Sequence, residues 1–337
     1  MHGPPQSRTF DVYGFRFSVS GNSAPAIESV NSDFAFFRSE PAGGEAAIEI
    51  LDEEPDYDSL PVCDASVYTP RNTVYHSGSL SYVDYHGRGL GLHAPRRRSF
   101  RIVSRDVHLL YEATYLFLLS QIGQELDRRG LHRLHALAMS LNGRALLVLL
   151  PMGGGKSTLG AHLLRYPELK MLSDDSPFVD SSGKVHAFPL HLGLLAGSEG
   201  EVPEQHRRFV NRMEFGPKFL VNFDYFADRV SASAEPGIVF LGGRTLSKEC
   251  RIEPAGMRAG LRAMVANGVI GMGLFHGLEF ILESSPWEIL TKTKLGWSRL
   301  ATFARLLRRS RVCRLHLGRD PEANAAAVVE FSRGVLG

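Results

Sequence analysis

The sequence predicts an α/β protein in which a β-rich N-terminal module precedes a nucleotide-binding domain. Residues 10–105 form short runs rich in Val, Tyr and Phe, separated by Gly, Pro and Asn, which is typical of strands. Beyond residue 131, strand-like runs alternate with helical ones, as in an α/β core. The segment Leu146–Gly160, LLVLLPMGGGKSTLG, leads from an apolar strand through three glycines to a helix start. We expect the second domain to be organised around this segment.

Length and composition fit an ordinary globular protein. A chain of 337 residues can hold two domains, and its apolar content of 44%, charged content of 22% and net charge of +2 are unremarkable for a globular protein. No apolar run reaches the roughly 18 residues that a membrane span requires, and MHGPPQSRTF lacks the apolar core of a signal peptide. The cysteines form neither a ligand pattern nor a disulfide framework. We therefore expect a cytoplasmic protein with no nucleic-acid partner and no membrane partner.

The N-terminal module, residues 1–105, is expected to consist of antiparallel strands. FDVYGFRFSVS alternates apolar and polar residues, and the further strand-like runs are FAFFRS, AAIEILD, SVYTP, TVYHSG, LSYVDYHG and LGLHAP. From Asp106 to Arg129 the apolar residues recur at helical spacing, and Gly130 follows a basic end. This pattern predicts a buried amphipathic helix. The change of period indicates a nucleotide domain over residues 106–337.

The nucleotide domain is expected to begin with a β-hairpin. HALAMSL and RALLVLL are strand-like, and Asn142-Gly143 between them is a strong hairpin signal. A helix begins at Lys156, whereas residues 198–235 lack regular periodicity. The other expected strands are KMLSDDSPFVD, VHAFPLHLGLL, IVFLGGR and CRLHLGRD, and the other expected helices are Met257–Ala266, Trp287–Leu307 and Glu322–Val335.

The glycine-rich segment predicts a site for a nucleoside triphosphate with Mg²⁺. Glycines allow backbone N–H groups to surround phosphate oxygens, and the N-terminus of the following helix adds positive potential. The lysine reaches the outer phosphates, and the hydroxyl after it can ligate Mg²⁺. Leu150 replaces the first glycine of the usual G-x-x-x-x-G-K-[ST] pattern. A Gly-rich turn with an exposed lysine is the alternative. The predicted phosphate-binding residues are Gly153, Gly154, Gly155, Lys156, Ser157 and Thr158.

Two further features carry acid–base chemistry. Asp174 and Asp175 follow an apolar run after the lysine. Paired carboxylates beside a phosphate site can divide two tasks, because one can hold Mg²⁺ while the other accepts a proton from the attacking hydroxyl. His135 precedes the strand that enters the loop and could lie beside this pair. An acidic turn and a core histidine are the alternatives.

Together these features resemble the HPr kinase/phosphorylase family, over LHALAMSLNG, LLPMGGGKSTLG and LSDDSPFVD. The resemblance implies a nucleotide domain like that of ATP-dependent phosphoenolpyruvate carboxykinase, with a mixed sheet instead of the ordinary parallel P-loop sheet. It implies that Asp174 is the catalytic base on the substrate serine and that His135 assists it. It also implies that Lys156 is catalytic and that Ser157 and Asp175 lie at the metal.

The β-rich N-terminus looks like that of the HPr-kinase-related proteins found in peptide-biosynthesis clusters, including lasso peptide clusters. The resemblance therefore implies an ATP-dependent, Mg²⁺-requiring kinase that phosphorylates a serine of a peptide or small protein. It also allows a homo-oligomer.

Cations that could stabilise the transferring phosphoryl group are expected farther along the chain. The candidates, in order of preference, are Lys218 in GPKFLVNF, Arg244 in LGGRTLSK and Arg319 in LGRDP. For each, the alternative is a surface or salt-bridged side chain.

The same residues are compatible with two other functions. The chain could be a nucleotide-binding regulatory or assembly module, or a nucleoside triphosphate hydrolase without a protein acceptor. The sequence contains no N-K-x-D motif for reading guanine, which disfavours a GTPase.

Overall fold

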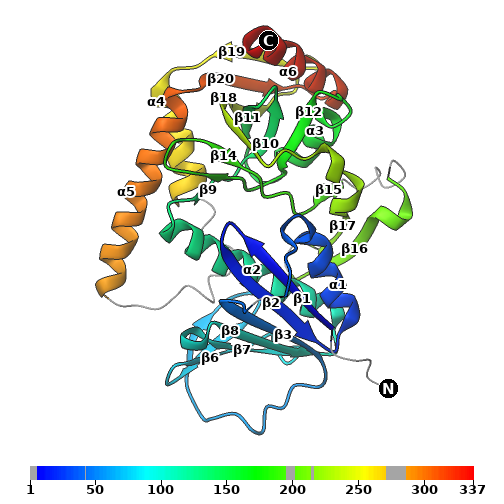
Figure 1. Ribbon diagram of the computed structural model, residues 1–337, viewed down its shortest axis with the longest axis vertical. Coiled ribbons are helices and arrows are strands. Elements are labelled where there is room, and N and C mark those ends of the chain that lie inside the picture. The colour runs from blue at the N-terminus through cyan, green and yellow to red at the C-terminus, as the bar shows by residue number, and fades with distance from the viewer. Residues whose placement is uncertain (1–5, 42, 195–201, 214–215, 271–285) are drawn as a thin grey trace. The chain divides into compact units, whose positions relative to one another are not determined.

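The computed structural model describes residues 6–194, 202–213, 216–270 and 286–337, except residue 42. By its internal contacts the chain divides into two compact units (Figure 1). The first unit contains the described residues up to Glu125 together with those of Arg208–Lys218, and the second contains the remainder. The division of the main chain falls inside helix α2, Val107–Arg128, later than the boundary that we expected at residue 105.

The first unit is built on a mixed eight-stranded sheet in the order β1-β2-β3-β8-β7-β6-β5-β4. We expected antiparallel pairing throughout, but β2–β3 and β3–β8 are parallel. The parallel pair β2–β3 arises because helix α1, Ala24–Asp33, connects these two strands. The strands are β1 Gln6–Val12, β2 Phe15–Gly21, β3 Ala46–Asp52, β4 Ala65–Tyr68, β5 Thr73–Ser77, β6 Leu80–Asp84, β7 Gly89–Ala94 and β8 Ser99–Ser104.

The run FAFFRS, which we expected to be a strand, is helical instead. It closes α1 and continues as the 3₁₀ turn η1, Ala35–Phe37. Phe34 and Phe37 are both buried and stand three residues apart, a spacing that places two side chains on one side of a helical turn but on opposite faces of a strand. Phe34 packs on Phe10 and Phe17, with ring centroids 5.9 and 5.4 Å apart. The other 3₁₀ turn of this unit is η2, Pro95–Arg97.

One face of this sheet is buried. Phe17, Ile48 and Phe100 are almost completely buried, whereas Glu49 and Arg101 on the opposite face form an exposed ion pair. Helix α2 covers the buried face through Phe117, whose ring stacks on Phe100 at a centroid distance of 4.3 Å. The alternation of apolar and polar residues therefore has the ordinary cause, a sheet with one face packed and the other facing solvent.

A buried ion pair joins the segment Arg208–Lys218 to the helices of the first unit. The guanidinium of Arg208 donates to the carboxylate of Asp33, which is fully buried, and Tyr111 Oη donates to the same carboxylate at 2.6 Å. Burial and the Asp33 carboxylate raise the pKa of Tyr111 well above its ordinary value, so Tyr111 remains a donor. Burial disfavours the Arg208 charge, but the Asp33 carboxylate outweighs this effect and raises the pKa of Arg208.

The second unit is an α/β unit with a mixed sheet, as the sequence predicted. The sheet branches at β18. One path runs β12-β10-β11-β18-β20-β19, and the other leaves β18 through β14 to β13 and β9. Strands β11, β18 and β20 are parallel, and β10 and β12 are antiparallel additions. The strands are β9 His132–Arg133, β10 Leu137–Leu141, β11 Arg144–Leu149, β12 Leu169–Ser173, β13 Phe178–Val179, β14 Val185–His186, β18 Ser233–Arg244, β19 Arg251–Pro254 and β20 Arg311–Leu317.

Helices pack on this sheet in two pairs. Helix α3, Lys156–Leu163, lies against α6, Pro321–Leu336, and both contribute to a core that includes Val148, Phe240 and Leu315. Helix α4, Met257–Met264, packs on α5, Pro286–Arg308, and continues as the short π-helix η7, Val265–Ile270. The predicted hairpin turn is confirmed: Asn142 and Gly143 have φ of 51° and 74°, the left-handed values that such a turn requires.

The prediction that residues 198–235 are irregular is wrong for part of this stretch. Strands β16, Arg207–Arg212, and β17, Gly216–Val221, form a three-stranded sheet with β15, Leu192–Leu194, in the order β15-β17-β16. The 3₁₀ turns η4 Glu204–His206, η5 Phe223–Tyr225 and η6 Ala227–Arg229 account for the irregular appearance of the rest.

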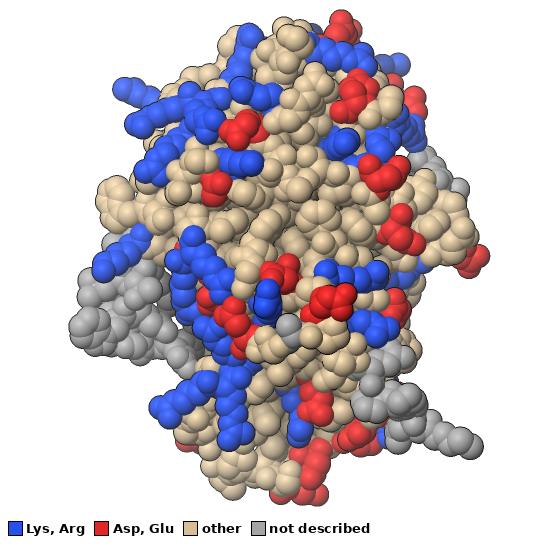
Figure 2. Space-filling view, in the orientation of Figure 1, with Lys and Arg blue, Asp and Glu red and all other residues tan. Residues whose placement is uncertain are grey.

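Acidic and basic side chains are interspersed on the face drawn in Figure 2. Within the described parts of the chain, no helix is both long enough and apolar enough to cross a membrane.

Candidate functional site

The glycine-rich loop joins β11 to α3 in the second unit, and its glycines are required by its geometry. Gly153 and Gly155 have φ of 72° and 98°, in the left-handed region that disfavours other residues. Gly154 N donates to Pro151 O at 3.0 Å, and a Cβ on Gly154 would lie 2.8 Å from that oxygen. The backbone therefore forms a narrow turn directly before the helix.

The first turn of α3 offers unpaired amides at the end of this loop. Gly155 is the N-cap and provides no side-chain acceptor, and the first turn contains no acidic residue. The first N–H groups of a helix have no intrahelical partner and favour an anion. Gly155, Lys156, Ser157 and Thr158 thus form a helix start whose amides could accept an anion.

Lys156 is folded back against its own loop. Its Nζ donates to Leu150 O at 2.8 Å, to Pro151 O at 3.3 Å and to His135 Nε2 at 2.7 Å. Only 7% of the residue is exposed. Burial lowers the pKa of Lys156, while the carboxylates of Asp175 and Asp174 act in the opposite direction. A charged ammonium group donates its three protons to these three acceptors.

His135 lies just before β10, between Lys156 and an acidic residue. His135 Nε2 lies 2.7 Å from Lys156 Nζ, and His135 Nδ1 lies 3.1 Å from Asp175 Oδ1 in a contact that lacks hydrogen-bond geometry. The backbone fixes this arrangement, since His135 N donates to Asn267 O at 3.1 Å and Ala136 N donates to Asp175 O at 2.9 Å. Lys156 and His135 are therefore hydrogen-bonded, and Asp175 lies next to the other ring nitrogen of His135.

Asp174 points to a different group. Ser157 Oγ donates to Asp174 Oδ2 at 2.8 Å, and the amide of Gly193 lies 3.5 Å from the same oxygen. Asp174 is only 8% exposed, whereas half of the Asp175 side chain is exposed. The structure thus pairs Asp174 with Ser157 and Asp175 with His135, the reverse of the pairing that the resemblance implies.

Of the three candidate cations, Arg244 is the one that lies at the loop. It ends β18, which runs parallel to β11, so both strands reach the same edge of the sheet. A Cβ placed on Gly155 would lie 3.7 Å from an Nη atom of Arg244. Arg244 is exposed, and no hydrogen bond or ion pair from a described residue holds its guanidinium. Lys218 lies on β17 and groups with the first unit. Arg319 follows β20, which is parallel to β18, but none of its hydrogen bonds or ion pairs among the described residues joins it to the loop.

The leucine that replaces the first glycine of the loop has a packing role. Leu150 is 1% exposed, and its side chain covers Gly242 of β18, where a Cβ would lie 2.6 Å from Leu150 Cδ2. The residue that departs from the usual motif therefore fills a space that a glycine on the neighbouring strand leaves open.

This packing predicts matched losses of stability. Leu150→Ala should lower the free energy of unfolding by about 2–5 kcal/mol because it leaves a cavity over Gly242. Gly242→Ala should lower it by about 1–3 kcal/mol because the new methyl group overlaps Leu150. Urea unfolding followed by circular dichroism measures both values. Gly243→Ala, where a Cβ would meet no atom within 4 Å, is the control. Equal losses for Gly242→Ala and Gly243→Ala would contradict the assigned contact.

Two elements of the site could not be identified from the sequence alone. Asn267 supports His135 through a backbone carbonyl, which any residue could provide. Gly242 carried a visible signal, because it directly follows the apolar run IVFL and stands beside Gly243, but nothing indicated its partner.

Comparison with protein-family models finds no match to this chain, and comparison with curated proteins finds no significant match.

Proposed function

We propose that this protein is an ATP-dependent kinase that transfers the γ-phosphoryl group to a serine hydroxyl of a peptide or small protein. The observation that carries the proposal is the separation of two adjacent carboxylates, one directed to the hydroxyl after the loop lysine and the other to a histidine. A binding module or a simple switch needs one carboxylate for the metal but no further carboxylate beside a histidine at its phosphate loop. An acceptor hydroxyl does need a proton acceptor.

The residues at the loop fit a nucleotide with Mg²⁺. The turn at Gly154 has no room for a Cβ, the amides of the helix start are available to phosphate oxygens, and Ser157 with Asp174 provides the oxygen donors that Mg²⁺ prefers. When bound, Mg²⁺ would neutralise charge on the phosphate oxygens. Lys156 would leave the carbonyls of the loop to contact phosphate, and Arg244 would approach from the end of β18.

Asp175 and His135 are proposed to activate the acceptor. Asp175 is the exposed carboxylate of the pair and can reach an incoming hydroxyl, whereas Asp174 is buried against Ser157. His135 lies beside Asp175 and, once Lys156 has moved to phosphate, has Nε2 available as an acceptor. In this assignment Asp175 takes the role that the resemblance gives to Asp174, and Asp174 takes the metal role. The finer fold relationship, to the HPr-kinase and phosphoenolpyruvate carboxykinase architecture, is part of the same proposal.

The proposal is tested by acceptor-dependent ADP release. The purified full chain is incubated with ATP and Mg²⁺, with and without a library of serine-bearing peptides and a matched library in which alanine replaces serine. We expect ADP release and phosphopeptide formation with the serine library only, and we expect Lys156→Met to abolish both. Full turnover without any peptide would instead indicate a hydrolase. Nucleotide binding without turnover under any condition would favour a regulatory module.

A further inference from the structure

A second hydrogen-bonded chain of acid, imidazole and hydroxyl lies in the second unit and takes no part in the proposed kinase reaction. His132 Nδ1 is 2.8 Å from Asp127 Oδ1, and His132 Nε2 is 2.8 Å from Ser298 Oγ. His132 is fully buried and Asp127 is 6% exposed, whereas Ser298 on α5 is exposed. The three groups are therefore in the order of a nucleophile, a base and an orienting carboxylate.

The charges around this chain fix the direction of its hydrogen bonds. Arg299 donates to both oxygens of Asp127 and to Gly268 O. Burial would raise the pKa of Asp127, but hydrogen bonds from His132 and Arg299 lower it below its ordinary value, so the carboxylate is ionised.

One tautomer of the His132 ring satisfies both of its side-chain partners. The Asp127 carboxylate is an acceptor only, so the ring proton lies on Nδ1 and Nε2 is the acceptor. Ser298 then donates its hydroxyl proton to Nε2. An exposed serine whose proton is directed at a buried base is an activated nucleophile.

We propose that Ser298 is a nucleophilic site that accepts an acyl group from an activated ester. Ser298 Oγ attacks the carbonyl carbon of the ester while its proton passes to His132 Nε2, and a C–O bond forms. The bond from the carbonyl carbon to the leaving oxygen then breaks, and the proton on His132 passes to that oxygen. The products are an ester of Ser298 and a free alcohol or phenol.

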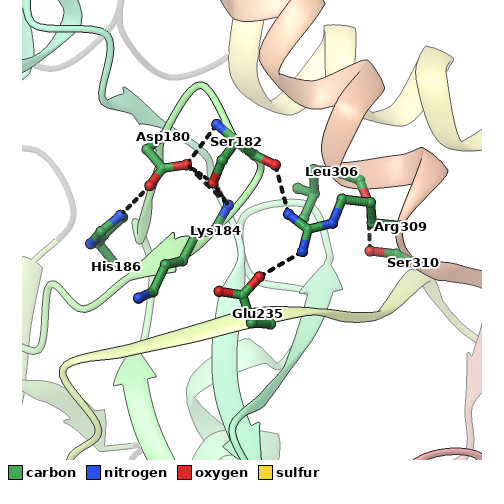
Figure 3. Close-up of polar contacts among 8 residues, drawn as sticks. All are labelled: Asp180, Ser182, Lys184, His186, Glu235, Leu306, Arg309 and Ser310. Carbon is green, nitrogen blue, oxygen red and sulfur yellow. Dashed lines mark hydrogen bonds and ion pairs between the residues drawn. The ribbon is translucent and has the colours of Figure 1, made fainter.

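The chain contains a matched control serine. Ser182 is exposed, and its Oγ donates to Asp180 Oδ1 at 2.6 Å, while His186 Nε2 lies 2.8 Å from the other oxygen of Asp180. Figure 3 shows Asp180 between Ser182 and His186, so the imidazole does not contact the hydroxyl. Hydrogen bonds from His186 and Ser182 lower the pKa of Asp180 against the effect of burial, which makes this carboxylate a weak base. Ser182 thus has the same residue types in an order that does not activate it.

The test uses p-nitrophenyl acetate and the full wild-type chain. Release of p-nitrophenolate is followed in time, and the acetylated residues are quantified by peptide mass spectrometry. General-base assistance is worth about 10²–10⁴-fold, so we expect Ser298 to be acetylated at least 100-fold faster than Ser182. We expect Ser298→Ala to remove the fast phase and Ser182→Ala to leave it unchanged.

The comparison of two serines within one folded chain does not depend on a variant that folds. His132→Gln, checked by its melting temperature, should reduce the rate at Ser298 to that at Ser182. Equal rates at Ser298 and Ser182 in the wild-type chain would overturn the proposal and leave the Asp127–His132–Ser298 chain as a structural link between α2 and α5. The outcome is independent of the kinase assay, because Lys156 has no part in it.

Discussion

Asp175→Asn is expected to slow phosphoryl transfer to a serine acceptor by about 10²–10⁴-fold, the usual contribution of a general base. Asparagine keeps the shape of the side chain but cannot accept the hydroxyl proton. Nucleotide affinity should change little, because Asp175 contacts His135 and not the loop hydroxyl. The measurement is kcat for the best peptide from the serine library, alongside Kd for a fluorescent ATP analogue.

Asp174→Asn is the matched variant, since it makes the same chemical change one residue away. We expect it to raise the Mg²⁺ concentration needed for half-maximal activity, because Ser157 loses its carboxylate partner at the metal site. Saturating Mg²⁺ should restore part of its activity but none of that lost in Asp175→Asn. The opposite result, with Asp174→Asn inactive at all Mg²⁺ concentrations and Asp175→Asn active, would return the base role to Asp174.

Arg208→Met is expected to lower the stability of the chain by about 3–5 kcal/mol, because it leaves the carboxylate of Asp33 buried without its cation. Asp33 is completely buried, and its carboxylate also accepts from the hydroxyl of Tyr111. Urea unfolding of the full chain, followed by far-ultraviolet circular dichroism, gives the change in the unfolding that involves the first unit.

The surface pair Arg16–Asp11 is the control for this prediction. Its N–O distance is 2.9 Å and half of the Arg16 side chain is exposed, so Arg16→Met should cost about 0–1 kcal/mol. Adding Asp33→Asn to Arg208→Met should recover part of the loss, because the buried negative charge is removed. If Arg208→Met and Arg16→Met cost the same, the buried pair contributes no more than a surface one.

Periodicity predicted most elements of the second unit, because each is long enough to show a repeat. Helices α5 and α6 were expected to within one residue of their observed bounds, whereas strand β18 was expected from Ile238 and begins at Ser233. The errors lie where a short run was decided by packing: FAFFRS became helical because Phe34 and Phe37 both enter the core of the first unit. Strands β16 and β17 were missed because their exposed and buried residues do not alternate cleanly.

The candidate site was predicted in its composition but not in its pairing. Asp174 and Asp175 follow β12 in a bend, where strand alternation does not determine the directions of the two side chains. The sequence contains no information on which of the two carboxylates faces α3. Only the three-dimensional structure shows that Asp174 faces Ser157 and that Asp175 faces His135.

The contact between Leu150 and Gly242 has an evolutionary consequence. The two positions share one fixed volume, so a glycine at position 150, as the usual motif has, would permit a larger residue at position 242. In chains related to this one, a smaller residue at position 150 should therefore accompany a larger residue at position 242. Because Arg244 stands two residues after Gly242, such an exchange would also change the separation between the glycine loop and the guanidinium of Arg244. Replacement of the first motif glycine by leucine is then coupled to a glycine on the neighbouring strand, and it leaves the turn at Gly153, Gly154 and Gly155 unaltered.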